Sequence, residues 1–132
     1  MIEANLKRDL VRQLLQEGGY GRRIEDKYAV GTLDLLLMTK RFVIYAEAKI
    51  MKGLVTLPIR ATQGAEIGRF NRIGNPNACA LIIGFRDGMI GFGLPGEHFL
   101  SRCACSWPLE MNVTLTEYLE LAAEHILEKE PA

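Results

Sequence analysis

Two nearly continuous apolar segments, joined by a short polar turn, constrain the fold of this chain more than any other feature. They span residues 33–38 and 42–49, on either side of Thr39-Lys40-Arg41. Apolar runs of this length without alternation are typical of strands that are covered on both faces. The pair therefore predicts a β-hairpin inside a sheet that has helices on each side.

Three charged side chains interrupt this apolar hairpin. Asp34 ends the sequence Gly31-Thr32-Leu33-Asp34, and Glu47 and Lys49 flank Ala48. Alternate residues of a strand share a face, so Glu47 and Lys49 lie together, and pairing about a turn near residue 40 places Asp34 opposite Glu47. Buried charges are costly unless they are paired or bound to a metal. The pattern predicts a polar cluster at one end of the sheet.

Two carboxylates beside a lysine are typical of a divalent-cation site for phosphoryl transfer. Carboxylates bind Mg²⁺, which activates a water and neutralises developing charge, while a lysine orients the water or stabilises the phosphate. The alternative is a surface ion pair between Glu47 and Lys49. The apolar neighbours of both residues argue against that alternative, and strand interiors are depleted in Asp.

The remaining chain predicts helices and strands around this hairpin. We expect the order helix, strand, strand, strand, helix, strand, strand, helix, which describes an α/β or α+β domain with a mixed central sheet. Thr114 is the expected N-cap of the last helix, with Glu117 completing a capping box. Before the hairpin we expect a helix over 3–16, ended by Gly18-Gly19, and a short strand within 20–30. After it we expect a helix from Pro58 to about 73, a strand over 78–85, a turn at 86–88 and a returning strand over 89–92. A turn-rich stretch over 91–96 and the last helix, from Thr114 to about 128, complete the chain.

Length and composition indicate one domain spanning residues 1–132, and we expect a cytoplasmic location without a membrane partner. No apolar run approaches the roughly 20 residues that a membrane helix needs, and the N-terminal residues are not those of a signal peptide. Three cysteines without a framework favour a reducing compartment. Cys103-Ala104-Cys105 lacks the paired histidines that would complete a zinc site.

The net charge of the chain is zero, but the charge is unevenly distributed. Residues 114–132 hold five glutamates against one lysine, so residues 1–113 carry a net charge of +4. A mildly basic body can contact phosphates. The same distribution also fits an ordinary solvated surface with an acidic C-terminal helix.

The combined pattern resembles the PD-(D/E)XK nuclease superfamily and, within it, stand-alone VRR-NUC domain nucleases. The resemblance spans about residues 3–84. It rests on Glu3 at the start of the first helix, on Gly31-Thr32-Leu33-Asp34, on Glu47-Ala48-Lys49 and on Gln63 in the following helix. Leu33 departs from the proline that the family often has before the aspartate.

The resemblance implies a restriction-endonuclease-like core and assigns roles to these residues. Asp34 and Glu47 would bind Mg²⁺ or Mn²⁺ together with the backbone carbonyl of Ala48, supported by Glu3. Lys49 would be the catalytic lysine, and Gln63 would position the lysine, the water or the phosphate. Without the resemblance, Glu3 is an ordinary first-turn acid and Gln63 an ordinary polar helix residue. The candidate phosphate contacts are Lys27, Lys52 and Arg60, with Arg22 and Arg23 as further candidates.

The implied function is a metal-dependent endodeoxyribonuclease, selective for branched DNA such as four-way junctions and acting as a homodimer in a bacterial or phage-infected cell. Two alternatives stay open. One is a module that binds DNA or assembles without turnover, which the intact Asp34, Glu47 and Lys49 disfavour. The other is a nuclease that acts on linear duplex DNA.

Overall fold

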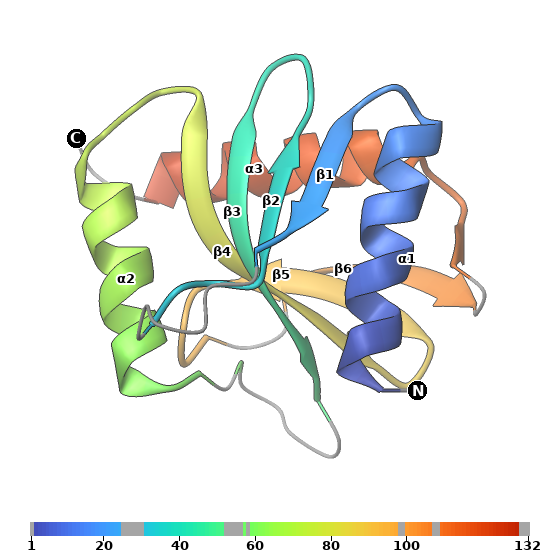
Figure 1. Cartoon of the computed structure of the whole chain (residues 1–132), viewed down its shortest axis with the longest axis horizontal. Coiled ribbons are helices and arrows are strands. Elements are labelled where there is room, and N and C mark those ends of the chain that lie inside the picture. Colours follow the sequence, from blue (N-terminus) through green and yellow to red (C-terminus); the bar gives the residue numbers. More distant parts are fainter. Residues whose placement is uncertain are drawn as a thin grey trace.

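The computed structural model describes residues 2–24, 31–51, 57, 59–97, 100–106 and 109–129, with the side chains of 100–104, 106 and 129 left aside. Its helices and strands follow in the expected order, with two further strands before the last helix (Figure 1). The elements are α1 (Glu3–Gln16), β1 (Tyr20–Arg23), β2 (Leu35–Met38), β3 (Val43–Ile50), α2 (Ala61–Arg72), β4 (Ala78–Arg86), β5 (Met89–Gly93), β6 (Leu100–Ser106), β7 (Glu110–Met111) and α3 (Leu115–Lys129).

The strands form one mixed sheet in which neighbours in sequence are neighbours in space, from β1 to β7. Every pair is antiparallel except β3 and β4, which run parallel. A parallel pair needs a crossover connection, and helix α2 supplies it, beside β4 in Figure 1. The expected mixed sheet flanked by helices is confirmed.

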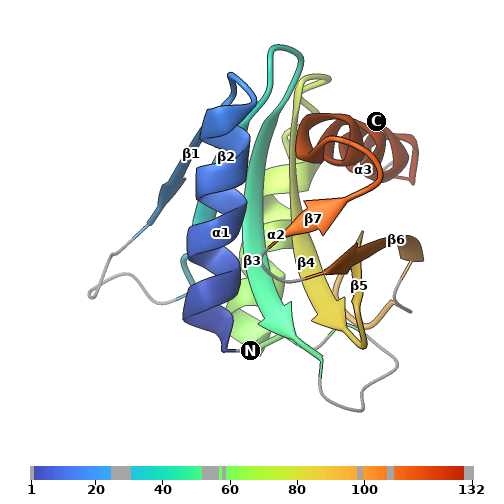
Figure 2. The ribbon, with the colours of Figure 1, turned by 90° about the vertical axis from the view of Figure 1, so that its right-hand side faces the viewer.

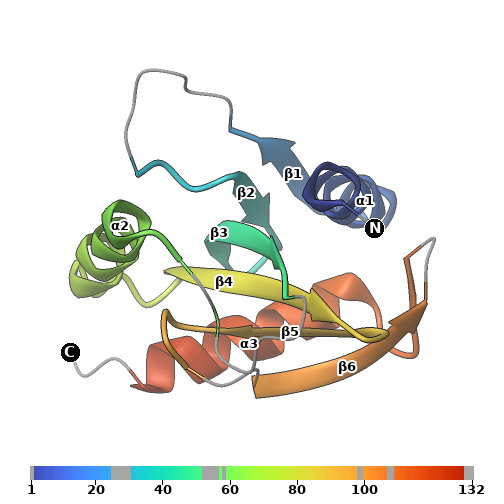
Figure 3. The ribbon, with the colours of Figure 1, turned by 90° about the horizontal axis from the view of Figure 1, so that it is seen from below.

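Helices cover the sheet on both faces, as the apolar hairpin predicts. One core joins α1 and α3 to the sheet through fully buried residues such as Leu10, Leu37 and Leu119. A second core packs Ile67 of α2 against Ala80 and Ile82 of β4. Figure 2 shows α1 and α3 on the near side of the sheet and α2 beyond it, and Figure 3 shows the same layers from below. Successive residues of a central strand therefore point alternately to the face covered by α1 and α3 and to the face covered by α2.

The register of the hairpin is the one that the sequence predicts. Leu35 pairs with Ala46, so Asp34 lies opposite Glu47. The strand bounds differ slightly from expectation, because regular pairing begins at Leu35 and not at Leu33. Asp34 therefore precedes strand β2, where its carboxylate is not confined to one face of the pleat.

The returning strand expected over 89–92 is confirmed as β5, but three details of the prediction were wrong. Strands β6 and β7 were not expected, and the turn-rich stretch predicted from residue 91 begins only after Gly93, where β5 ends. Glycines fit this strand because Gly84 and Gly91 face each other across β4 and β5, and a register shift follows at the same place in the β5–β6 pair. The predicted second helix begins later, at Ala61, and Pro58 lies outside the described residues.

Helix α3 begins as the sequence predicts and is tied to the end of α1. The backbone N–H of Glu117 donates to the Thr114 hydroxyl at 3.0 Å, which confirms the N-cap. The carboxylate of Glu17 accepts from the backbone N–H groups of Leu115 and Thr116. A neighbouring chain segment thus satisfies amides that a helix start leaves free. Across the described part of the chain, no helix has the length and apolar character that crossing a bilayer requires.

Candidate active site

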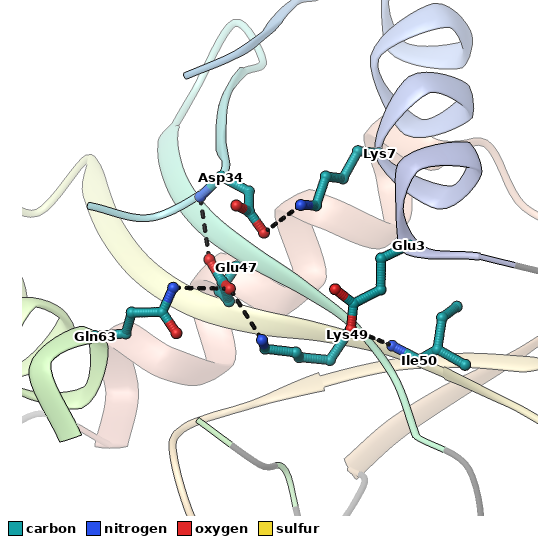
Figure 4. A network of polar contacts seen from close by, with 7 residues as sticks. All are labelled: Glu3, Lys7, Asp34, Glu47, Lys49, Ile50 and Gln63. Carbon is teal, nitrogen blue, oxygen red and sulfur yellow. Dashed lines mark hydrogen bonds and ion pairs between the residues drawn. The ribbon is translucent and has the colours of Figure 1, made fainter. Parts of the chain in front are cut away.

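Glu47 is the centre of a polar cluster on the C-terminal half of β3 and is only 2% exposed. Its Oε1 accepts from the backbone N–H of Asp34 at 3.2 Å. Its Oε2 accepts from the side-chain amide of Gln63 at 2.9 Å and lies 3.3 Å from the Lys49 ammonium. Four of the predicted site residues, Asp34, Glu47, Lys49 and Gln63, are therefore brought together by the segment before β2, by β3 and by α2 (Figure 4).

The segment before β2 is held in place by side chains of β3 and by close contact with α2. The backbone N–H of Leu33 donates to the Tyr45 hydroxyl at 2.9 Å, one residue before the Asp34 contact. Gly31 has φ +88°, and a Cβ there would lie 2.9 Å from the backbone oxygen of Thr62. The glycine of the Gly-x-x-Asp motif thus lets the Asp34 segment approach the first turn of α2.

Two lysines neutralise the two carboxylates, each from a different element. Lys49 follows Glu47 on the same face of β3, as the strand period predicts. Lys7 reaches across from α1 and places its Nζ 3.0 Å from Asp34 Oδ2 (Figure 4). Both lysine side chains are 17% exposed. The cluster is a set of charges largely withdrawn from water, which strengthens every interaction within it.

Burial makes Glu47 a weak acid. Desolvation and, after it, the neighbouring Asp34 raise the pKa of its carboxyl from the usual 4.5, Lys49 opposes the shift, and the net pKa is about 7. A positive charge placed beside this carboxyl would stabilise its ionised form. A divalent cation bound beside it would offset both the burial and the repulsion from Asp34.

This pKa shift predicts a pH-dependent stability in EDTA. The folded protein holds the Glu47 proton more tightly than the unfolded chain, so its unfolding free energy should fall as pH rises from about 4.5 to about 7. Glu47→Gln should lack this fall. The difference in unfolding free energy between Glu47→Gln and wild type should therefore shift in favour of the variant by on the order of 2 kcal/mol between pH 4 and pH 8. Urea denaturation across this pH range measures the difference.

Glu128→Gln is the matched control, since it removes one carboxylate from an exposed position of α3. Its pH profile should run parallel to that of the wild type. Parallel profiles for wild type and Glu47→Gln would mean that Glu47 ionises in the folded protein as it does in the unfolded chain.

The donor set fits a hard divalent cation. Among the described residues, Asp34 Oδ2 and Gln63 Oε1 are buried oxygens to which no donor hydrogen-bonds. The Lys7 ammonium near Asp34 Oδ2 makes an ion pair with it and not an aligned hydrogen bond. Carboxylate oxygens are among the ligands that Mg²⁺ takes in proteins, so Asp34 Oδ2 and the Glu47 carboxylate can serve a cation, and Gln63 Oε1 can accept from a water beside it.

Two other predicted ligands lie at the edge of this cluster. Glu3 accepts from the backbone N–H of Ile50 at 3.5 Å, at the end of β3. Among the described residues, no three His, Cys, Asp or Glu side chains gather as a ready metal site, so Glu3 does not form one with Asp34 and Glu47. Ala48 lies between Glu47 and Lys49 with its side chain buried in the core. The proposed roles of the Glu3 carboxylate and the Ala48 carbonyl stay predictions.

Of the predicted phosphate contacts, the structure describes Arg60. It is exposed and occupies the N-cap position of α2, three residues before Gln63. Arg22 and Arg23 are exposed on β1. Lys27 and Lys52 lie outside the described residues.

Sequence reasoning missed two side chains that complete the cluster, Lys7 and Tyr45. Lys7 stands four residues after Glu3, and residues at this spacing share one face of a helix. Tyr45 stands two residues before Glu47 on the same face of β3, and its hydroxyl also donates to Glu66 of α2 at 3.3 Å. Both could have been found by extending the predicted helix and strand faces by one step.

The chain matches no protein-family model, and no curated protein matches it in sequence. Among solved structures, its fold is similar to that of Hjc, a Holliday junction resolvase from the archaeal hyperthermophile Archaeoglobus fulgidus. The TM-score is 0.55 and the sequence identity 19%, and the likeness covers 69% of this chain and 75% of that chain. At this identity it is a likeness of fold, and it confirms the expected restriction-endonuclease-like α/β architecture.

Proposed function

We propose that this chain is a divalent-metal-dependent endonuclease that hydrolyses DNA phosphodiester bonds, with selectivity for branched DNA such as four-way junctions. The observation that carries the proposal is the convergence of Asp34 and Glu47 with Lys49 at the end of β3. The likeness of the fold to a Holliday junction resolvase supports the choice of substrate. The proposal places the chain with the VRR-NUC nucleases, as the sequence motifs suggest.

The residues of the cluster divide the work of hydrolysis between them. Asp34, Glu47 and the Ala48 carbonyl hold Mg²⁺ or Mn²⁺, with Glu3 supporting the site from α1. The bound cation supplies a Lewis acid that lowers the pKa of a water and neutralises charge on the phosphate. Lys49 orients the attacking water or stabilises the charge that develops on the phosphate oxygens.

Gln63 acts from α2 as a positioning residue. Its amide N–H₂ donates to Glu47, so the orientation of the side chain is fixed by the same carboxylate that would hold the cation. The other end of the amide, Oε1, is free to accept from a water or from the Lys49 ammonium. Phosphates along the DNA would be contacted by Arg60 at the start of α2, and by Lys27 and Lys52.

A homodimer fits this function because a junction resolvase must cut two strands, and one cluster of this kind cuts one strand. Two copies related by a two-fold axis would present two such sites to the two-fold symmetric junction.

The proposal is tested with a labelled four-way junction and its matching linear duplex, each incubated with Mg²⁺, Mn²⁺ or EDTA. We expect metal-dependent cleavage of the junction, little cleavage of the duplex, and no cleavage by Asp34→Ala. Equal cleavage of both substrates would support the nuclease activity and contradict the selectivity for branched DNA. No cleavage of either DNA with any metal would contradict the enzyme and favour a module that binds DNA without turnover.

A further inference from the structure

Lys7 belongs to the charged cluster but has no part in the proposed hydrolysis. It points at Asp34 from α1, with its ammonium 3.0 Å from Oδ2. Its neighbours on the helix, Leu6 and Leu10, are fully buried in the core between α1 and the sheet. The backbone that carries Lys7 is therefore fixed, and the ammonium is delivered to one oxygen atom.

That oxygen is the one a metal would need. Asp34 Oδ2 is buried and has no hydrogen-bond donor among the described residues. A divalent cation bound to Asp34 Oδ2 would lie close to the Lys7 ammonium, and the two positive charges would repel each other. The Lys7 and Asp34 side chains are largely buried, which leaves little water to screen this repulsion. One carboxylate oxygen cannot serve both at full strength.

The charges of the cluster lead to the same conclusion. When both carboxyls are ionised, Asp34 and Glu47 bring two negative charges, and Lys7 and Lys49 bring two positive charges, one beside each carboxylate. A divalent cation added to this balanced set leaves an excess of positive charge. The excess is relieved when the Lys7 ammonium, on its flexible four-carbon stem, swings away from Asp34 toward solvent or toward an anion.

We propose that Lys7 competes with the divalent cation for Asp34 and so lowers the metal affinity of the site when no DNA is bound. The inference rests on the proposed function, because it takes Asp34 to be a metal ligand. Lys7 is then a positioning residue that acts through Asp34. An incoming DNA phosphate is the anion that would draw its ammonium away, so metal and DNA would favour each other's binding.

The test is Mn²⁺ binding to the metal-free full chain without DNA, measured by isothermal titration calorimetry and by the electron paramagnetic resonance of free Mn²⁺. Lys7→Met keeps the apolar stem and removes the charge. It should bind Mn²⁺ about fivefold more tightly than wild type, which is the effect of losing a competing ion pair of about 1 kcal/mol. Lys7→Arg keeps the charge and should not bind more tightly than wild type.

Lys40→Met is the matched control, because it removes a lysine charge at the β2–β3 turn, at the far end of β2 from Asp34, and should leave the Mn²⁺ affinity unchanged. Melting temperatures in EDTA verify that each variant is folded. Unchanged or weaker Mn²⁺ binding by folded Lys7→Met, beside measurable binding by wild type, would overturn the competition alone. No Mn²⁺ binding by the wild type would overturn the competition and the proposed metal site together.

Discussion

Lys49→Ala is expected to lower the rate of metal-dependent junction cleavage by about a thousandfold or more. The Lys49 ammonium is the positive group that β3 itself delivers to the cluster, 3.3 Å from Glu47 Oε2 and 17% exposed. Groups that move a proton or stabilise charge in a transition state contribute roughly 10² to 10⁴ to the rate. Single-turnover cleavage of a labelled four-way junction, at saturating protein, measures the loss of the chemical step.

Asp34→Ala and Lys40→Ala separate the role of Lys49 from the role of the metal ligands. Asp34→Ala should lose both Mn²⁺ binding and cleavage, whereas Lys49→Ala should keep Mn²⁺ binding and lose cleavage. Because Lys49 lowers the pKa of Glu47, the comparison is made near pH 8.5, above the pKa of about 7 that Glu47 has in the wild type. Lys40→Ala should cleave as wild type does. Cleavage by Lys49→Ala within tenfold of the wild-type rate would contradict the proposed mechanism.

Gly31→Ala is expected to lower the unfolding free energy by about 2–4 kcal/mol. Gly31 has φ +88°, which an alanine adopts only with strain. An added Cβ would also lie 2.9 Å from the oxygen and 3.1 Å from the carbon of the Thr62 backbone carbonyl. These are main-chain atoms of α2, so either the helix or the Asp34 segment must move. Urea denaturation at constant pH gives the difference in unfolding free energy.

Gly18→Ala is the matched control for this contact. Gly18 has nearly the same backbone angle, φ +89°, but nothing lies within 4 Å of the Cβ that it would gain. Gly18→Ala should therefore lower the unfolding free energy only by the cost of the backbone strain, about 1 kcal/mol. Equal losses in the two variants would mean that the approach of Gly31 to α2 does not contribute to stability.

Local sequence determined the central hairpin and the first helix almost completely. The bounds of α1 are those predicted, and the pairing of Leu35 with Ala46 follows from the position of the turn alone. Both are local features, because the apolar period of a helix and the turn of a hairpin are encoded by residues that are close in sequence. The meeting of Asp34 with Glu47, and of Glu47 with Lys49, was predictable for the same reason.

The second half of the sheet was less predictable because its strands are specified by their partners. The sequence of β6 has no clean alternation, and the glycines of β5 argue against a strand when taken alone. Gly91 is acceptable there only because Gly84 faces it across the pair. Propensity for strands depends on what lies opposite, and this information is not local.

The sequence by itself determined which residues carry charge into an apolar hairpin, and tertiary structure decided what those charges contact. Helix α1 brings Lys7 to Asp34, and α2 brings Gln63 to Glu47. The burial that raises the pKa of Glu47 exists only once helices cover both faces of the sheet. Spacing along a strand fixes neighbours on one face, but contacts between separate elements, and the loss of water around them, arise from packing.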